Sequence, residues 1–338
     1  MPRLCLLADD LTGALDSAAR FVAACGPVPV SWRGGFAEGA RDLATREGSE
    51  AAAVAAHAAC GPALRRAGLA FKKLDSLLRG HVAAEIAASW RAGSFDHAVI
   101  APAFPFQGRI THGGRQFAHG AAVGPDLAAA LAQHGVAVIQ CRPGMAAPLG
   151  VSLWDAATDA DLAVIAAAGR ALPGRVLWCG TGGLAGTLAG GDVPCPVLPE
   201  PVLALIGSEH AVSRGQLAAT ARHLVLAEDE RAVPSLPAAV SLALPPGLAR
   251  EAAAERIARA FVALARRVAR PGSLAVAGGE TLRGLCDGLG ATGLVVLGEM
   301  EPGAAISRME GGLWHGLPIL SKSGAFGAPD FLARLLGG

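Results

Sequence analysis

Short apolar segments alternate with alanine-rich amphipathic segments in the first half of the chain. Residues 4–8 form an apolar run typical of a buried strand. Over 13–24 apolar residues recur every three or four positions, which predicts a helix that ends at Gly26-Pro27. The same order continues through predicted strands at 70–74, 97–101, 136–140 and 176–179 and predicted helices at 82–90 and 184–189. This order predicts a mainly parallel sheet with helices on both faces.

The segment 190–201 interrupts this pattern with four prolines. Proline lacks a backbone N–H and has a fixed φ, so the segment is neither a helix nor a central strand. The alternation then resumes with predicted strands at 202–206, 273–277, 294–297 and 318–320 and predicted helices at 212–221, 248–269 and 282–289. We therefore expect an α/β protein of two domains, 1–200 and 201–338, each a mainly parallel sheet flanked by helices. A chain of 338 residues can bury two cores.

Composition narrows the classes of partner. Hydrophobic residues make up 52% of the chain, yet no apolar run approaches the roughly 18 residues of a membrane span. The net charge of +1 gives no reason to expect nucleic acid. Seven scattered cysteines without a CxxC motif indicate reduced thiols, and with no signal pattern at the N-terminus we expect a cytoplasmic protein. The nine histidines show no HxxxH or HExxH spacing, so no histidine-ligated metal is expected.

The segment 72–80, Lys-Lys-Leu-Asp-Ser-Leu-Leu-Arg-Gly, concentrates charge in a chain with only 17% charged residues. It follows a predicted strand and leads into a predicted helix, so its polar groups point into one mouth. Arg79 can bind a carboxylate through two parallel hydrogen bonds, while Asp75 and Ser76 can bond to hydroxyls. The pattern therefore indicates a site for a small polyhydroxylated anion. A solvated strand end, with Ser76 capping the next helix, explains the segment equally well.

Two further motifs of the first half follow predicted strands. Asp9 and Asp10 come after the first strand, and a carboxylate there can orient or deprotonate a substrate hydroxyl. The alternative role of Asp10 is to cap the 13–24 helix together with Thr12. Arg109 closes a proline-containing loop after the third strand, where it can add positive charge to a pocket or lie on an ordinary surface loop.

Three strand ends of the second half carry glycines and hydroxyl groups, at 207–208, 278–281 and 322–327. Glycines let backbone N–H groups approach phosphate oxygens, and a helix N-terminus favours negative charge. Glu280 can hold a metal directly or through water. Together the three predict a nucleotide site, although glycines also end strands for purely structural reasons and there is no GxxxxGK[ST] motif. The predicted nucleotide-binding residues are Ser208, Gly278, Gly279, Glu280, Thr281, Lys322 and Gly324.

These motifs, in this order, resemble the four-carbon acid sugar kinases. The family's opening ADDLTGA followed by an Asp-Thr pair is present at 8–14 and as Asp16-Ser17. Its KKIDSTLRGN motif corresponds to 72–81 and its APAFP…GR loop to 101–109. Its GGET and KSGxFGxxDF motifs are intact at 278–281 and 322–331. The resemblance covers nearly the whole chain.

The resemblance implies that the first domain binds a four-carbon sugar acid and that the second binds ATP with Mg²⁺. The γ-phosphoryl group would pass to the 4-hydroxyl of a threonate, an erythronate or an oxo-tetronate. It implies Asp10 and Arg79 as catalytic residues; the implied substrate-binding residues are Asp9, Lys73, Asp75, Ser76, Gly80 and Arg109. Metal ligands and the epimer are left open, and a homodimer is possible.

The chain departs from the family pattern at several positions. Leu77 replaces a threonine and His81 an asparagine, which implies a different hydroxyl contact. Glu209-His210 stand in the glycine-serine loop where small residues are usual, and the substrate domain is short between about 115 and 200. A dehalogenase-like phosphatase is disfavoured, because Ala8 stands where its nucleophile belongs. A non-catalytic sugar-acid sensor on a trimmed kinase fold remains the alternative, against which the intact GGET and KSGxFG motifs argue.

Overall fold

A computed structural model describes residues 3–228 and 230–337. The chain divides into two compact units, Met1–Val193 and Pro194–Gly338. This division and the sequence-based boundary near residue 200 both lie within the proline-rich segment 190–201. In both units mainly parallel strands are flanked by helices, so the predicted α/β class is confirmed.

The first unit is built on an eight-stranded parallel sheet with the order β2-β3-β1-β4-β11-β5-β10-β9. Its central strands are buried along their whole length, as expected when helices cover both faces. The strands are β1 (Leu4–Ala8), β2 (Val28–Ser31), β3 (Gly39–Asp42), β4 (Leu69–Lys73), β5 (His97–Ala101), β9 (Val138–Cys141), β10 (Val151–Trp154) and β11 (Val176–Gly180). A separate antiparallel sheet contains β6 (Arg109–His112), β7 (Arg115–Ala118) and β8 (Ala121–Val123).

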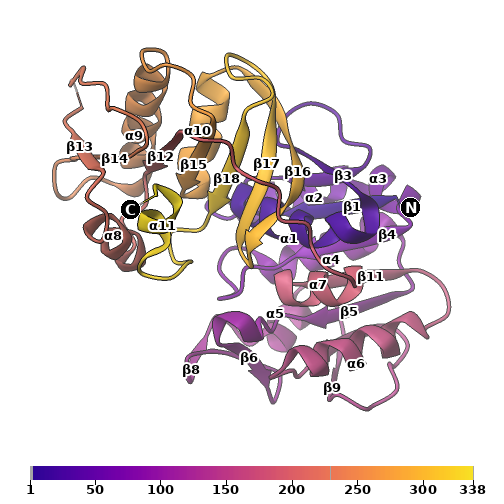
Figure 1. Ribbon diagram of the computed structural model, residues 1–338. Coiled ribbons are helices and arrows are strands. Elements are labelled where there is room, and N and C mark those ends of the chain that lie inside the picture. The colour runs from indigo at the N-terminus through magenta and orange to yellow at the C-terminus, as the bar shows by residue number, and fades with distance from the viewer. Residues whose placement is uncertain (1–2, 229, 338) are drawn as a thin grey trace. The chain divides into compact units, whose positions relative to one another are not determined.

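Two helical layers cover the first sheet. The helices α1 (Leu11–Cys25), α7 (Gly182–Ala189) and α6 (Asp159–Arg170) pack in a row on one face, as Figure 1 shows. On the other face α4 (Val82–Gly93) packs against α2 (Glu50–Ala59), α3 (Gly61–Arg66) and α5 (Leu127–Gln133). A short 3₁₀ helix, η1 (Pro105–Gln107), follows β5. The sequence analysis missed α2, α3, α5 and α6, because short or alanine-rich segments show little contrast between an apolar and a polar face.

The second unit contains a seven-stranded sheet with the order β13-β14-β12-β15-β18-β17-β16. The first five strands in this order are parallel, whereas β18, β17 and β16 pair antiparallel. The strands are β12 (Val202–Ile206), β13 (His223–Leu226), β14 (Ala238–Leu242), β15 (Ser273–Ala277), β16 (Ala291–Glu301), β17 (Ala304–Gly311) and β18 (Pro318–Lys322). The strand predicted at 294–297 is thus one arm of a long hairpin. A two-residue turn at Pro302-Gly303 joins its arms, and Gly303 has the positive φ of +88° that favours glycine there.

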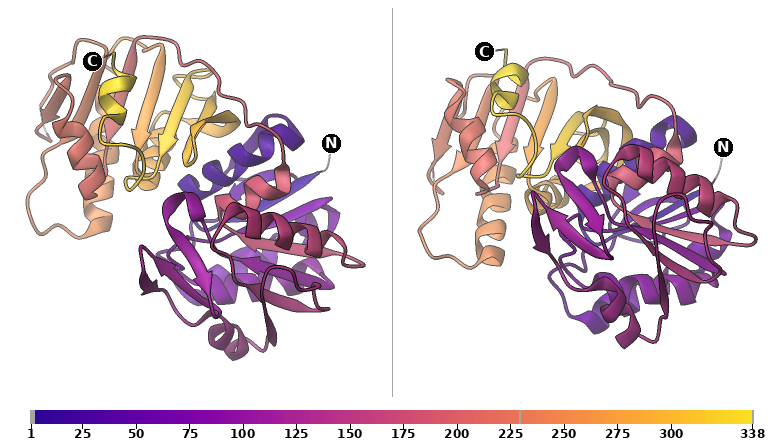
Figure 2. Two further views of the ribbon diagram at one scale, coloured as in Figure 1. Left: turned by 60° about the horizontal axis from the view of Figure 1, so that its bottom comes forward. Right: turned by 90° about the horizontal axis from the view of Figure 1, so that it is seen from below.

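Helices flank this second sheet on both faces, as Figure 2 shows. The pair α9 (Arg250–Ala265) and α10 (Gly279–Gly288) packs on one face. On the other face α8 (Ala211–Ala218) and α11 (Phe331–Leu335) cover a core that includes Ala204, Leu217 and Phe331. The sequence predicted a helix at 282–289, but α10 begins directly after β15. Glu280 and Thr281 therefore lie in its first turn and not in a preceding loop.

Candidate functional site

Three neighbouring parallel strands of the first unit bring the predicted acidic and basic residues together. β3 and β4 pair on either side of β1, with Ala8 opposite Asp42 and Leu7 opposite Lys72. The carboxyl ends of the three strands therefore lie side by side, which is where open α/β sheets place ligands. The chain leaves these ends through the segments 9–10, 43–46 and 74–80.

Arg46 binds carboxylates from two of these segments. Its Nε and Nη2 donate to Oδ2 and Oδ1 of Asp9 at 2.7 and 3.0 Å, and its Nη1 donates to Oδ2 of Asp10 at 2.9 Å. Its Nη2 also lies 3.4 Å from Oδ1 of Asp75. The Arg46 side chain is only 11% exposed. We call Asp9, Asp10, Arg46, Asp75 and Arg79 the carboxylate–guanidinium cluster.

Electrostatics inside the cluster favour the charged forms of Arg46 and Asp75. Burial lowers the pKa of Arg46, but the charges of Asp10 and Asp9 outweigh burial and raise it overall. Burial by itself raises the pKa of Asp75. The hydrogen bond from Arg79 and the charge of Arg46 outweigh burial and hold this pKa well below its usual value. Because these buried charges are paired, removal of one partner would leave an uncompensated charge in the protein interior.

Asp75 organises the segment that follows β4. Its carboxylate accepts a bidentate pair from Arg79, with Nε at 2.9 Å and Nη2 at 2.7 Å. The backbone N–H groups of Leu77 and Arg79 also donate to Oδ2 of Asp75, at 3.1 and 3.2 Å. The Arg79 side chain nevertheless remains 55% exposed, and Nη1 takes no part in the pair. Asp75 therefore fixes a guanidinium that can still contact solvent or a ligand.

The other predicted residues of the first unit surround the cluster. Gly80 has a φ of +79°, and a Cβ there would lie 3.3 Å from Cα of Arg46. The Lys73 ammonium donates to the carbonyl of Leu74 at 2.8 Å and would lie 3.1 Å from a Cβ at position 13. Burial lowers the pKa of Arg109, and the charge of Asp75 opposes this shift. Arg109 therefore lies close enough to the cluster to interact with it electrostatically. Ser76 is half-buried, and its carbonyl accepts from Gln116 at 3.1 Å.

Sequence analysis missed Arg46 and the buried groups beneath it. Thr45 donates to Oε1 of Glu85 at 2.5 Å, and Lys72 lies 2.9 Å from Oε2 of the same carboxylate. The backbone N–H of Thr45 donates to the carbonyl of Asp9 at 3.1 Å, which ties the segment 43–46 to the end of β1. His57 borders this pair, and burial with the charge of Lys72 lowers its pKa to about 4. No motif marked Arg46, because β3 is too short to stand out as a strand.

Three parallel strand ends of the second unit also converge, as predicted from their glycines. A Cβ at Gly207 would lie 2.0 Å from Oγ1 of Thr281, and one at Gly324 would lie 1.8 Å from Oγ of Ser208. Ser213 ties the third segment to α8 by donating to the carbonyl of Gly324 at 2.8 Å. These segments approach so closely that only glycine fits at 207 and 324. We call Gly207, Ser208, Gly278, Thr281 and Gly324 the glycine cluster.

The first turn of α10 lies at the glycine cluster without a side-chain cap. Its N-cap is Gly278, with φ +111° and no side-chain hydrogen bond to the helix. The first N–H groups of a helix lack intrahelical acceptors, and together with the helix dipole they attract an anion. Gly278 and Gly279 therefore lie where such an anion would bind.

Lys322 and Glu280 have partners that sequence analysis did not anticipate. The Lys322 ammonium is buried and donates to the carbonyls of Phe326 and Ser323 at 3.0 and 3.4 Å, which shapes the segment 323–327. Burial lowers the pKa of Lys322 to about 8. Glu280 is half-exposed and lies 3.2 Å from Nη2 of Arg250. Both residues stay predicted nucleotide-site residues, with Lys322 contacting the loop in this structure.

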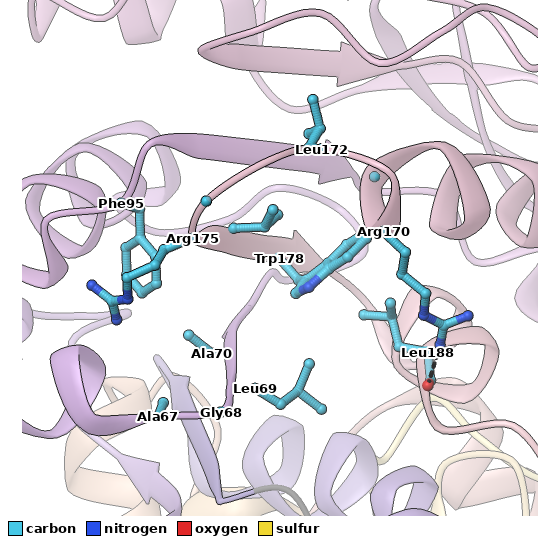
Figure 3. Close-up of a pocket in the computed structure, with 13 residues that line it drawn as sticks. Ala67, Gly68, Leu69, Ala70, Phe95, Arg170, Leu172, Arg175, Trp178 and Leu188 are labelled. Atoms are coloured by element: carbon cyan, nitrogen blue, oxygen red, sulfur yellow. Dashed lines mark hydrogen bonds between the residues drawn. The ribbon is translucent and has the colours of Figure 1, made fainter.

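A pocket of about 350 Å³ lies at the opposite end of the strands of the first sheet, near the amino ends of β4 and β11 (Figure 3). Its arginines contact backbone carbonyls: Arg170 donates to Leu188 at 2.7 Å and Arg175 to Leu64 at 2.7 Å. Arg175 also lies over the ring of Phe95. The pocket is thus separate from the carboxylate–guanidinium cluster, which lies at the carboxyl ends.

Within residues 3–228 and 230–337, no group of three histidine, cysteine or acidic side chains is arranged to hold a metal ion. Over the same residues, no helix has both the length and the apolar character needed to cross a membrane.

Two family models match the chain, a sugar-binding N-terminal domain over residues 4–140 and a nucleotide-binding C-terminal domain over 235–332. A D-threonate kinase of Bordetella bronchiseptica is 32% identical, over 98% of this chain and 96% of the relative. A D-erythronate kinase of Heliobacterium modesticaldum is 30% identical, over 86% and 83%. A solved Salmonella typhimurium protein described as a putative tRNA synthase superposes with a TM-score of 0.75 at 21% identity, over 98% of both chains, and so supports the fold alone.

A sugar-binding and a nucleotide-binding domain in one chain, with kinases as relatives along nearly all of it, define a phosphotransferase. This chain belongs to the four-carbon acid sugar kinase family.

The low pKa of Asp75 predicts a specific loss of stability in acid. A carboxylate with a folded-state pKa below its unfolded value stabilises the fold above the unfolded pKa, about 4, and loses this contribution as pH falls below it. We expect wild type to lose about 2 kcal/mol more unfolding free energy than Asp75→Asn between pH 6 and pH 2. Urea denaturation at each pH measures this difference. The control Asp126→Asn, at an exposed carboxylate, should lose as much unfolding free energy as wild type. An equal loss for wild type and Asp75→Asn would contradict the low pKa assigned to Asp75.

Proposed function

We propose that this enzyme transfers the γ-phosphoryl group of ATP to the terminal 4-hydroxyl of a four-carbon sugar acid of the threonate, erythronate or oxo-tetronate class. The observation that carries the proposal is the carboxylate–guanidinium cluster, because it combines a half-exposed guanidinium with several oriented carboxylates. The names of the relatives support the same substrate class.

Arg79 would bind the carboxylate of the acid. Asp75 fixes its Nε and Nη2, while Nη1 and the exposed face of the guanidinium stay available for a second anion. Lys73 and Arg109 would add positive charge beside it, and Asp9 and Ser76 would contact hydroxyls. Since Arg46 compensates the cluster's carboxylates, an acidic substrate would meet less repulsion there.

Asp10 would orient the attacking hydroxyl. Its Oδ1 accepts from the N–H of Gly13 at 2.9 Å and its Oδ2 accepts from Arg46 at 2.9 Å, so the carboxylate is held in one direction. Each oxygen retains a lone pair for a hydroxyl. Phosphoryl transfer depends mainly on positioning and charge stabilisation, so a fixed carboxylate suits this task. The helix-capping role and the catalytic role of Asp10 are thus compatible.

The glycine cluster would bind the phosphates of ATP. Backbone N–H groups at the start of α10, with the hydroxyls of Ser208 and Thr281, are donors of the kind that phosphate oxygens accept. Mg²⁺ usually binds through one or two carboxylates together with substrate phosphates and water, which fits the lack of a three-ligand cage among the described side chains. Glu280 would then hold the ion through water, and the bound ion would neutralise phosphate charge.

Two finer properties stay predictions. The cysteines that the structure describes are unpaired thiols, which supports a reducing, cytoplasmic location. The second is a homodimeric assembly.

A coupled assay of ATP consumption over both enantiomers of threonate and erythronate and over the oxo-tetronates tests the function. We expect acid-dependent ATP consumption with at least one of them and a 4-phosphorylated product by NMR. Specific binding of an acid without ATP consumption would instead establish the sensor alternative.

Asp10→Asn and Arg79→Ala should separate chemistry from binding. Asparagine still caps α1 but removes the charge that orients the hydroxyl, so we expect kcat to fall by about 10²–10⁴. Arg79→Ala should mainly raise KM for the acid, by roughly tenfold to a hundredfold. Steady-state kinetics measures both effects, with Asp161→Asn, a carboxylate at the start of α6, as the control. A wild-type kcat for Asp10→Asn, or a wild-type KM for Arg79→Ala, would remove the tested residue from the site.

Gly324→Ala should impair nucleotide binding selectively. The added Cβ would overlap Ser208 and force apart two segments of the glycine cluster. We expect KM for ATP to rise by about tenfold or more, with KM for the acid unchanged. Gly215→Ala on α8 is the matched control, because a Cβ there meets nothing within 4 Å. A folded Gly324→Ala with wild-type KM for ATP would contradict the assignment.

A further inference from the structure

A buried carboxyl group with an unused oxygen lies on α1, beyond the turn that Asp10 caps. Asp16 is only 5% exposed, and its Oδ1 has no hydrogen-bond partner among the described residues. A buried polar atom without a partner costs free energy, and most buried polar atoms in native proteins are therefore bonded. The neighbourhood of Asp16 indicates what would satisfy it.

The surroundings of Asp16 connect it to the predicted substrate site. The positive charges of Lys73 and Arg20 and the negative charge of Asp10 all act on it. The Lys73 ammonium has three donors, and the bond to the carbonyl of Leu74 is its one hydrogen bond within the part of the chain that the structure describes. Oδ1 of Asp16 can thus still accept a hydrogen bond, and the Lys73 ammonium nearby can still donate further ones.

Two glycines let the backbone approach these groups closely. A Cβ at Gly182, the first residue of α7, would lie 3.0 Å from Oδ2 of Asp16 and 3.1 Å from the ring of Phe104. A Cβ at Gly13 would lie 3.1 Å from the Lys73 ammonium. The backbone of α7 and α1 thus packs against the Asp16 carboxyl and the Lys73 ammonium, and within the described residues it supplies no hydrogen-bond partner for Oδ1 of Asp16.

The electrostatic surroundings of Asp16 suit a neutral, polar partner. Burial raises its pKa, against the opposing charges of Lys73 and Arg20. A carboxyl group in a setting that disfavours its charge can donate as well as accept a hydrogen bond. A hydroxyl, which also does both, is its natural complement.

We propose that Asp16 is a further substrate-binding residue, whose carboxyl group bonds to a secondary hydroxyl of the sugar acid while Lys73 donates to the same oxygen. Asp10 would hold the reacting hydroxyl at the start of α1, and Asp16, further along the same helix, would form a hydrogen bond with a neighbouring hydroxyl. This inference rests on the proposed function. It gives α1 two polar contacts with one ligand and makes Asp16 a determinant of substrate choice.

A cycle that pairs enzyme variants with substrate analogues tests the contact. Wild type and Asp16→Ala are assayed at saturating ATP with the preferred tetronate and with its 2-deoxy and 3-deoxy analogues. We expect Asp16→Ala to lower kcat/KM by about 10- to 100-fold on the full substrate, the effect of one lost hydrogen bond in a buried site. On the analogue that lacks the bonded hydroxyl, the two enzymes should differ by less than about threefold. An equal loss on all three acids would overturn the proposal and make Asp16 structural.

Controls separate this outcome from a failure of the proposed function. Ser89→Ala removes another buried, unpartnered side-chain oxygen, in α4 on the other face of the sheet, and should leave the kinetics unchanged. Thermal melting checks that each variant folds; if Asp16→Ala does not, the isosteric Asp16→Asn should show a smaller loss with the same dependence on the analogue. Failure of wild type to phosphorylate any four-carbon acid would refute the proposed function, whereas uniform loss in the cycle refutes the role of Asp16 alone.

Discussion

The ion pairs of Arg46 are the interaction on which the candidate substrate site depends. One guanidinium, nearly removed from water, binds Asp9 and Asp10 directly and approaches Asp75. Three carboxylates at the ends of adjacent strands would otherwise repel one another. Arg46 compensates their negative charge at the ends of the strands. Its removal would leave the buried Asp9 without this partner, whereas Asp75 would keep its pair with Arg79. An uncompensated buried charge is far more destabilising than the loss of an exposed ion pair.

The layer beneath Arg46 explains how a loop residue is held so firmly. Thr45, next to it, bonds to Glu85 of α4 and to the backbone of Asp9, while Lys72 pairs with the same glutamate. A helix on one face of the sheet thereby positions a side chain at the strand ends. Ligand sites of this kind need supporting hydrogen bonds to stay in one geometry. The buried pair of Lys72 and Glu85 below the cluster provides that support. This role explains why a chain with few charged residues keeps two of them buried here.

The second unit positions its candidate site by close backbone packing and uses few charges. Gly207 and Gly324 allow Thr281 and Ser208 to lie against neighbouring strand ends, and α10 begins immediately at the cluster without a side-chain cap. The two sites thus differ in kind. One is made of paired side-chain charges that suit a small acid, and the other of backbone donors and hydroxyls that suit phosphates.

The sequence by itself determined the α/β class, the order of the main elements and most of the candidate residues, because strand ends with polar or glycine-rich segments are visible in the one-dimensional pattern. Asp10, Asp75 and Arg79 were found in this way. Only the tertiary structure decided that Arg46 joins them, since its loop follows a short strand and its partners lie more than twenty-five residues away in either direction. It also decided that Lys322 contacts its own loop and that Oδ1 of Asp16 has no hydrogen-bond partner among the described residues. Pairing and burial are properties of contacts between distant segments, and no local pattern encodes them.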